Sequence, residues 1–252
     1  MFSARNRRWW ILVAMTGSLA MIMIDQTIVS VALPRIQRDL DLSQTDLQWV
    51  INAYILALAA TVAIGGRIGD LVGRVKAFMG GATLFAGASV LCGLAPNETV
   101  IILGRVLQGI GAAFMQPASA AIVTTTFGLH ERGKAMAVYA GVAMSFMAAG
   151  PLLGGALTQY LSWRWAFWIN IPVAAAAMAL TLLVRPKDEK PPPNPWTLPV
   201  FPSLFWVPPP LSWQSSRAEL GDGHRRLFWS FLQQESAFSG FLWWLRQGSK
   251  TP

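Results

Sequence analysis

Six long apolar stretches fill most of the first 185 residues of this chain and limit what it can fold into. They are Trp9–Leu33, Asp46–Gly65, Ala77–Ala95, Val100–Thr124, Ala135–Tyr160 and Trp165–Val184. A helix of about 20 residues crosses the hydrocarbon core of a bilayer. Because that core holds no water to bond free backbone groups, such segments must be helical. The sequence therefore predicts an all-α integral membrane protein with a six-helix bundle over residues 1–186.

Composition excludes several other classes of protein. Charged residues make up 13% of the chain, about half of what a soluble domain carries. The single cysteine excludes an intramolecular disulfide framework and a multi-thiolate metal site. Neither histidine, His130 or His224, lies in a cluster with metal-ligand spacing, and no phosphate-binding loop or nucleophile elbow is present. We expect no enzyme activity, no cofactor and no metal.

Lysines and arginines are distributed unequally between the two sets of loops. Eleven lie on one side: Arg5, Arg7 and Arg8; Arg67, Arg74 and Lys76; Arg132 and Lys134; and Arg185, Lys187 and Lys190. The opposite side holds Arg35, Arg38 and Arg164. This bias predicts a plasma-membrane protein with both termini in the cytoplasm. It also accounts for much of the net charge of +8 without nucleic acid as a partner. A cleaved signal peptide is the weaker interpretation of the first stretch, since five more spans follow.

The last part of the chain differs in character from the rest. Residues 191–252 contain 10 of the 16 prolines and 6 of the 12 tryptophans, but no Ile, Met or Tyr. Runs of proline exclude a helix at Pro191–Pro195 and Pro208–Pro210. We expect an irregular proline-rich tail over residues 187–252. An interfacial amphipathic helix at Leu227–Leu245 is the alternative.

Two ionisable residues lie inside apolar spans, where lipid exposure is costly. Asp25 on the first span is interpreted as a proton carrier, a contact for a cationic substrate or a helix-packing partner; an aspartate reached by water is the alternative. Arg105 shares one helical stripe with Gln108, Ala112 and Gln116 on the fourth span. It can hold an acidic partner, or it can snorkel to the membrane surface.

Weaker candidates lie on three other segments. Gln48 and Asn52, four residues apart on the second span, are expected to hydrogen-bond neighbouring helices. The loop between the second and third spans carries Asp70, expected near the start of a helix, and nearby arginines. On the fifth span, Gly150 and Gly154 form a face that lets two backbones approach, and Pro151 introduces a bend.

Several segments together resemble the major facilitator superfamily, and in particular its fourteen-span drug/proton antiporter branch (EmrB/QacA type). The segments, all with matching order and spacing, are Ile24–Pro34 (similar to LDxTIVNVALP), Gly66–Lys76 (the loop motif), Leu103–Ala112 (RxxQGxGA), Gly150–Gly155 (the antiporter motif) and Trp163–Pro172 (WRWxFxINxP). The resemblance covers residues 10–186. It implies that the predicted bundle is the N-terminal half of the family's fold.

The resemblance also implies roles for individual residues. Asp25, Arg105, Gln108 and Asn52 would line a cavity or couple transport to protons. A latch in the cytoplasmic loop would be formed by Gly66, Asp70, Gly73 and Arg74. The antiporter motif would comprise Gly150, Pro151, Gly154 and Gly155. Leu71 and Val75 depart from the pattern, because basic residues are frequent at both positions.

The implied function is proton-coupled export of hydrophobic or cationic small molecules by alternating access. Such transporters need two bundles with the substrate site between them. We therefore expect either a homodimer or a missing second half, with a change of reading frame near Pro191–Trp196. A six-span membrane anchor or regulator, whose tail binds a partner protein, is the alternative.

Overall fold

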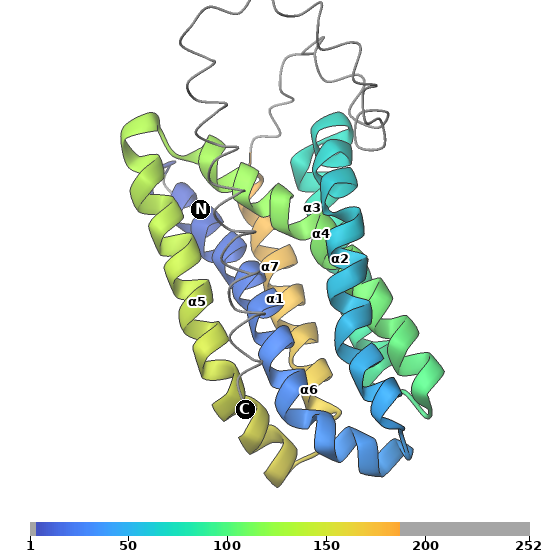
Figure 1. The fold of residues 1–252 in the computed structure, drawn as a ribbon. Coiled ribbons are helices and arrows are strands. Elements are labelled where there is room, and N and C mark those ends of the chain that lie inside the picture. Colours follow the sequence, from blue (N-terminus) through green and yellow to red (C-terminus); the bar gives the residue numbers. More distant parts are fainter. Residues whose placement is uncertain (1–3, 187–252) are drawn as a thin grey trace, which may run out of the picture. The chain divides into compact units, whose positions relative to one another are not determined.

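Residues 4–186, which the computed structural model describes, form a bundle of helices (Figure 1). The elements are α1 (Ala4–Leu40), α2 (Gln44–Val72), α3 (Arg74–Gly93), α4 (Glu98–Thr126), α5 (Leu129–Tyr160), α6 (Trp165–Trp168) and α7 (Asn170–Val184). Within residues 4–186, six segments are long and apolar enough to cross a membrane, and α6 and α7 together form the last. The predicted all-α, six-span architecture is confirmed. The predictions for the tail fall outside the described residues.

The helices extend beyond the apolar stretches because polar turns and caps continue them. Ser43 begins α2 with a reciprocal cap: its hydroxyl accepts a hydrogen bond from the Asp46 amide, and the Asp46 carboxylate accepts one from the Ser43 amide. At the start of α4, the Asn97 side chain accepts a bond from the Val100 amide. Such caps satisfy backbone donors that the first helical turn leaves free. Hydropathy alone does not detect them.

The loop predicted after the second span is largely helical. α2 continues through Gly65 and Gly66 to Val72, so Asp70 lies in the last turn of α2 rather than near the start of a helix. The helix is interrupted at Gly73, whose φ of 114° is unfavourable for residues with a β-carbon. α3 then begins at Arg74. The prediction for Asp70 was wrong because one glycine, not the whole glycine-rich segment, ends the helix.

The last span is interrupted at Ile169, which separates α6 from α7. Pro172 follows in the first turn of α7, where its missing N–H costs no helical hydrogen bond. A helix therefore restarts at Asn170. This restart places the Asn170 side chain at the level of the bundle interior, where it is 1% exposed.

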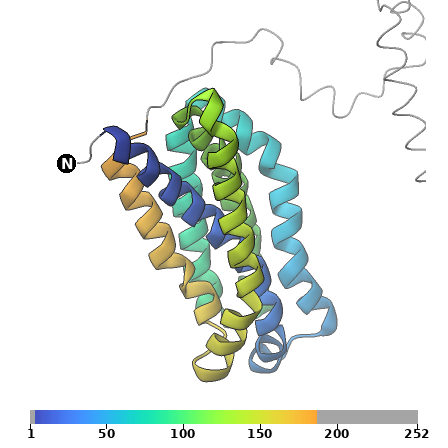
Figure 2. The ribbon, with the colours of Figure 1, turned by 90° about the vertical axis from the view of Figure 1, so that its left-hand side faces the viewer.

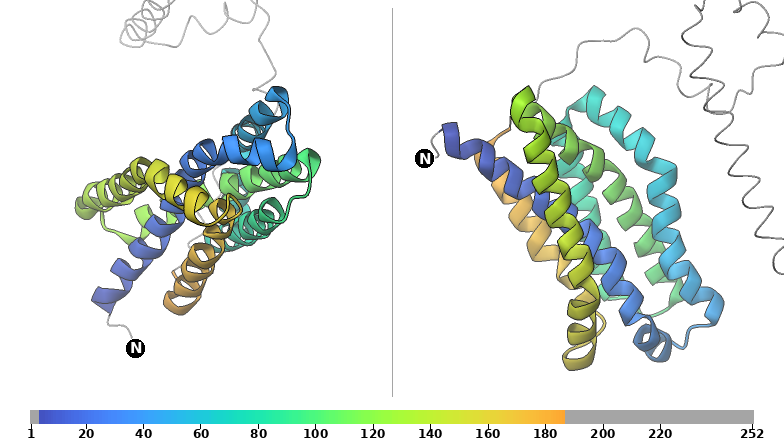
Figure 3. Two further views of the ribbon diagram at one scale, coloured as in Figure 1. Left: turned by 90° about the horizontal axis from the view of Figure 1, so that it is seen from below. Right: turned by 60° about the vertical axis from the view of Figure 1, so that its left-hand side comes forward.

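The helices pack in two related groups. α1 packs mainly against α5 and α7, whereas α4 packs mainly against α2 and α3. Figures 2 and 3 show α1 crossing the bundle obliquely, with α5 and α7 beside it. The first span of each half thus packs against the second and third spans of the other half: α1 against α5 and α7, and α4 against α2 and α3. Such a pattern is typical of a transporter bundle built from two three-helix repeats.

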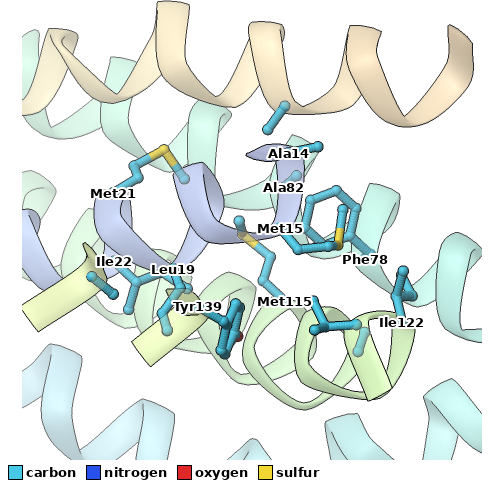
Figure 4. Packing of buried hydrophobic residues seen from close by; sticks show 14 of the residues in the cluster. Ala14, Met15, Leu19, Met21, Ile22, Phe78, Ala82, Met115, Ile122 and Tyr139 are labelled. Atoms are coloured by element: carbon cyan, nitrogen blue, oxygen red, sulfur yellow. The ribbon is translucent and has the colours of Figure 1, made fainter. Parts of the chain in front are cut away.

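Large side chains from the two groups meet in the apolar core. Met15 of α1 lies near Phe78 of α3 and Met115 of α4, and Ile22, seven residues further along α1, belongs to the same core; all four are fully buried (Figure 4). Tyr139 of α5 joins them, and its hydroxyl lies 2.7 Å from the Ser119 hydroxyl of α4. The core therefore connects α1 to both α4 and α5 and so joins the two groups of helices.

The start of the first span and the end of the last span lie on the same side of the bundle. Nε of Arg7 donates a 2.7 Å hydrogen bond to the Val184 carbonyl at the end of α7. Arg8 forms a 2.5 Å ion pair with Glu131 at the start of α5. The beginnings of α1 and α5 and the end of α7 therefore lie together, as an even number of spans requires.

Candidate functional site

A cluster of polar side chains is buried within the apolar spans, where α1, α3, α4 and α7 approach one another. Its members are Asp25 of α1, Ser89 of α3, Arg105 and Gln108 of α4, and Asn170 of α7. Each is at most 2% exposed. Four helices thus contribute to a single polar site in surroundings that are otherwise apolar.

Asp25 is held by three donors from two helices. Nη1 of Arg105 lies 2.5 Å from one carboxylate oxygen. The other oxygen accepts bonds from Nε2 of Gln108 at 3.2 Å and from Nδ2 of Asn170 at 2.8 Å. Asp25 is 0% exposed, so the alternative of an aspartate reached by water does not hold in this conformation.

Arg105 is paired on several sides. Besides Asp25, it donates through Nε to the Val50 carbonyl of α2 at 3.0 Å and through Nη1 to Oε1 of Gln108 at 2.9 Å. Its guanidinium carbon lies 4.2 Å from the centre of the Tyr54 ring, within the range of a cation–π contact. An arginine that snorkels to the membrane surface is excluded, because the side chain is 2% exposed.

Gln108 connects the ion pair to α3. Its oxygen accepts a bond from Arg105, while its nitrogen donates to Asp25 and to the Ser89 hydroxyl at 2.8 Å. Ser89 in turn donates to the Phe85 carbonyl of its own helix at 2.8 Å. The network therefore joins α1, α3, α4 and α7 through hydrogen bonds between side chains.

The arrangement is sensitive to the charge on Asp25. One carboxylate and one guanidinium cancel, so the buried cluster carries no net charge. Removing either charge from such a pair leaves the partner uncompensated in a medium of low dielectric constant. The stability of the cluster within the apolar spans therefore depends on both charges of the pair.

The structure brings together some predicted residues and separates others. Arg105 and Gln108 lie on one buried stripe, as their spacing indicates, and meet Asp25. Asn52 does not join them: it is exposed and makes no hydrogen bond to the cluster. Val50 and Tyr54, two positions before and after it, are buried, and a separation of two residues turns a helix to its opposite side.

Sequence reasoning did not assign Asn170, Ser89 or Tyr54 to the site. Asn170 and Ser89 are isolated polar residues in apolar spans, and that pattern could have identified them. Tyr54 carries no such sign, because an aromatic residue in an apolar span is usually part of the core.

The loop residues of the predicted latch lie at one end of α2 and α3. Arg74 and Asp70 form a 3.4 Å ion pair across the break, and the Asp70 side chain is 43% exposed. Gly73 forms the break itself, and Gly66 faces Pro117 of α4. The pair joins two consecutive helices and lies far in the sequence from Asp25.

We expect Asp70→Asn to change the free energy of unfolding by less than about 1 kcal/mol, because exposed ion pairs contribute little. Denaturant titration of the purified chain in detergent micelles measures this difference. A loss of several kcal/mol would mean that Asp70 supports the fold of this half rather than a contact with another bundle.

The glycines of the fifth span pack closely against α1. A β-carbon on Gly154 would lie 3.1 Å from backbone atoms of Ile28, and one on Gly150 would collide with Thr27. By contrast, a β-carbon on Gly155 would meet nothing within 4 Å, and Pro151 is exposed. Only Gly150 and Gly154 therefore permit the close α1–α5 approach.

Among residues 4–186, no group of three His, Cys, Asp or Glu side chains is close enough to hold a metal ion. The one carboxylate of the buried cluster is already matched by a guanidinium and two amides.

The profile of the family described as Major Facilitator Superfamily matches residues 15–247, most of the chain. The chain belongs to the Major Facilitator Superfamily. It is therefore a multi-pass membrane protein of a transporter family and not an enzyme. The resemblance based on five motifs is confirmed.

Several curated relatives are drug-resistance proteins. The chain is 44% identical to the puromycin resistance protein of Streptomyces alboniger over 73% of this chain and 37% of the relative. For the tetracenomycin C resistance and export protein of Streptomyces glaucescens the identity is 38%, over 71% and 34%. For the lincomycin resistance protein of Streptomyces lincolnensis it is 36%, over 89% and 46%. The chain thus spans less than half the length of these relatives.

A solved structure supports the fold. The crystal structure of a bacterial homologue of the human lysosomal transporter Spinster, inward-facing and unoccupied, matches with a TM-score of 0.58 and 23% identity. The match covers 76% of this chain and 46% of that one. The described bundle therefore corresponds to half of a superfamily fold.

Proposed function

We propose that this chain supplies the N-terminal bundle of a proton-coupled exporter of hydrophobic or cationic compounds, with Asp25 as the proton-binding group. The single observation that carries the proposal is the fully buried Asp25–Arg105 pair within the membrane spans. Membrane-embedded ionisable groups are costly and are typically retained for function. The names of the relatives, which refer to drug resistance and export, support the substrate class.

In the proposed cycle, the ionised Asp25 holds α1 and α7 against α4. Protonation of Asp25 removes the attraction to Arg105, which keeps its contacts to Gln108 and the Val50 carbonyl of α2. Arg105 would thus stay with α2 and α4, while α1 becomes free to change its packing. Gly150 and Gly154 provide the close α1–α5 surface along which α1 can move. The Asp70–Arg74 pair would latch the cytoplasmic side.

The proposal requires a second bundle, because the substrate site of such transporters lies between two bundles. A second copy of the chain with the same orientation or a separate second half would supply it. The family profile and the lincomycin-resistance alignment both continue beyond residue 186. A change of reading frame near Pro191–Trp196 stays a proposal, which translation of the source nucleotide sequence in the other two frames tests.

We further propose that both termini face the cytoplasm. The bias of lysine and arginine between the two sets of loops supports this orientation. Cysteine labelling of intact cells, with a reporter cysteine at Arg132 on one side and at Arg38 on the other, tests it. Labelling of the Arg132 position by an impermeant reagent would contradict the proposal and indicate the opposite orientation.

Proton-driven efflux from liposomes tests the transport proposal. We expect the reconstituted chain to move a fluorescent lipophilic cation when an inward proton gradient is imposed, and Asp25→Asn to abolish the dependence on the gradient. The exposed change Asp41→Asn is the matched control and should leave efflux unchanged. Crosslinking in the same liposomes reports whether the active form is a dimer.

Two outcomes would count against different parts of the proposal. Efflux that stays proton-dependent in Asp25→Asn would dismiss the carboxylate role. A monomer without efflux would dismiss the homodimer and leave the separate second half as the required partner. Labelling of Asp25 by a hydrophobic carbodiimide, which modifies protonated carboxyl groups, tests proton binding in the chain without transport.

A further inference from the structure

An apolar cavity of about 220 Å³ lies among α1, α5 and α7, beside the buried polar cluster. Its wall includes Gly17 and Met21 of α1, Val142 and Phe146 of α5, and Asn170 and Val173 of α7. Figure 4 shows Met21 extending from α1 toward the ribbon of α7. Every lining residue is apolar except Asn170. All of its lining residues belong to this one bundle.

Asn170 presents one unused polar atom at this cavity. Its amide nitrogen donates to Asp25 at 2.8 Å and to Ser89 at 3.4 Å, and the described residues provide no donor for its amide oxygen. Rotation of the amide by half a turn would place that oxygen against the Asp25 carboxylate, so the network fixes the orientation. Asn170 is 1% exposed. An unpartnered acceptor at the cavity can accept a hydrogen bond from a ligand that enters it, with the modest net gain of one hydrogen bond.

We propose that this cavity binds a compact lipophilic amine, with the apolar rings of the ligand between α1, α5 and α7 and its N–H donating to the amide oxygen of Asn170. An apolar cavity of about 150 Å³ accepts a benzene ring, so this one can accept a bicyclic ring system. An acyl chain of a lipid would fill the same space but would leave the Asn170 oxygen unpaired. The inference concerns binding to this bundle and does not depend on transport.

A pair of probes of equal shape tests the hydrogen bond. Naphthylamine carries the N–H donor, and methylnaphthalene replaces it with a methyl group. We expect the 252-residue chain in lipid nanodiscs to bind naphthylamine about threefold to tenfold more tightly than methylnaphthalene, the range expected for one net hydrogen bond. Fluorescence titration measures both affinities, with empty nanodiscs subtracted to remove partition into lipid.

Two variants locate the site. Gly17 lines the cavity, and a β-carbon there would meet nothing within 4 Å, so we expect the ring of Gly17→Phe to occupy the cavity and to abolish binding of both probes. Gly87→Phe is the matched control, because Gly87 is exposed on α3 and equally open. Asn170→Leu should abolish the preference for the amine while methylnaphthalene still binds.

Each result decides the proposal. Saturable binding of naphthylamine that Gly17→Phe removes and Gly87→Phe preserves, together with weaker binding of methylnaphthalene, supports it. No binding to the unmodified chain, unchanged binding in Gly17→Phe, or equal affinities for the two probes would overturn it. Should Asn170→Leu fail to fold, the probe pair and Gly17→Phe still give a decision.

Discussion

Asp25→Asn is expected to lower the free energy of unfolding of the bundle by about 3–5 kcal/mol, the cost of removing one partner of a buried ion pair. Arg105 is 2% exposed and keeps its charge at any accessible pH, so it cannot escape the penalty by losing a proton. The remaining contacts of Arg105, to Gln108 and the Val50 carbonyl, carry no full negative charge.

Hydrogen bonding adds to this loss. The two carboxylate oxygens of Asp25 accept bonds from three donors, contributed by Arg105, Gln108 and Asn170. An asparagine at position 25 has only one side-chain oxygen, and its NH₂ group would face a donor. Although the substitution is nearly isosteric, it therefore leaves at least one buried donor without an acceptor.

Denaturant titration in detergent micelles measures the effect. The exposed substitution Asp41→Asn makes the same chemical change outside the bundle interior and should shift stability by less than about 0.5 kcal/mol. In a double-mutant cycle, Asp25→Leu combined with Arg105→Leu should recover much of the loss, because no lone charge remains. A double variant as unstable as the sum of the single variants would contradict a direct ion pair.

Gly109→Ala is expected to be the second large effect, a destabilisation of about 1–3 kcal/mol from overpacking. A β-carbon at Gly109 would lie 2.4 Å from the Tyr54 carbonyl oxygen and 2.9 Å from Cβ of Ala57 on α2. Both contacts are closer than van der Waals distance, and one is to backbone, so α2 must move away from α4. Such a shift also displaces Tyr54, whose ring lies over the Arg105 guanidinium.

Gly87→Ala is the matched control for this substitution. A β-carbon there meets nothing within 4 Å, so the change should stabilise α3 by up to about 1 kcal/mol through helix propensity. Opposite signs for the two variants in the same titration would establish a close α2–α4 contact. Equal effects would show that helix propensity, and not packing, determines both.

Spacing along single helices predicted part of the site correctly. Arg105 and Gln108 are three residues apart on one helix, and a polar stripe in an apolar span must face protein. Because helical periodicity is local, the sequence predicts this stripe without knowledge of the other helices. The same reasoning does not say which way a lone polar residue points, and Asn52 on α2 lies on the exposed side.

Contacts between distant segments were not available from the sequence. Asp25 and Arg105 are separated by 80 positions, and Asp25 and Asn170 by 145. Their meeting depends on how α1, α4 and α7 pack and on the break at Ile169, after which α7 begins with the buried Asn170. The positions of Ser89 and Tyr54 in the cluster follow from the same packing.

The sequence by itself determined that six helices cross a membrane, since length, apolar content and the lack of water in hydrocarbon allow no other structure. It also located the two ionisable residues that such spans do not tolerate in contact with lipid. Only the tertiary structure decided that these residues pair, that Asn170 completes the pair, and that one amide oxygen remains free beside an apolar cavity. The reason is physical: hydropathy is a property of each segment alone, whereas a partner for a buried charge exists only where helices meet.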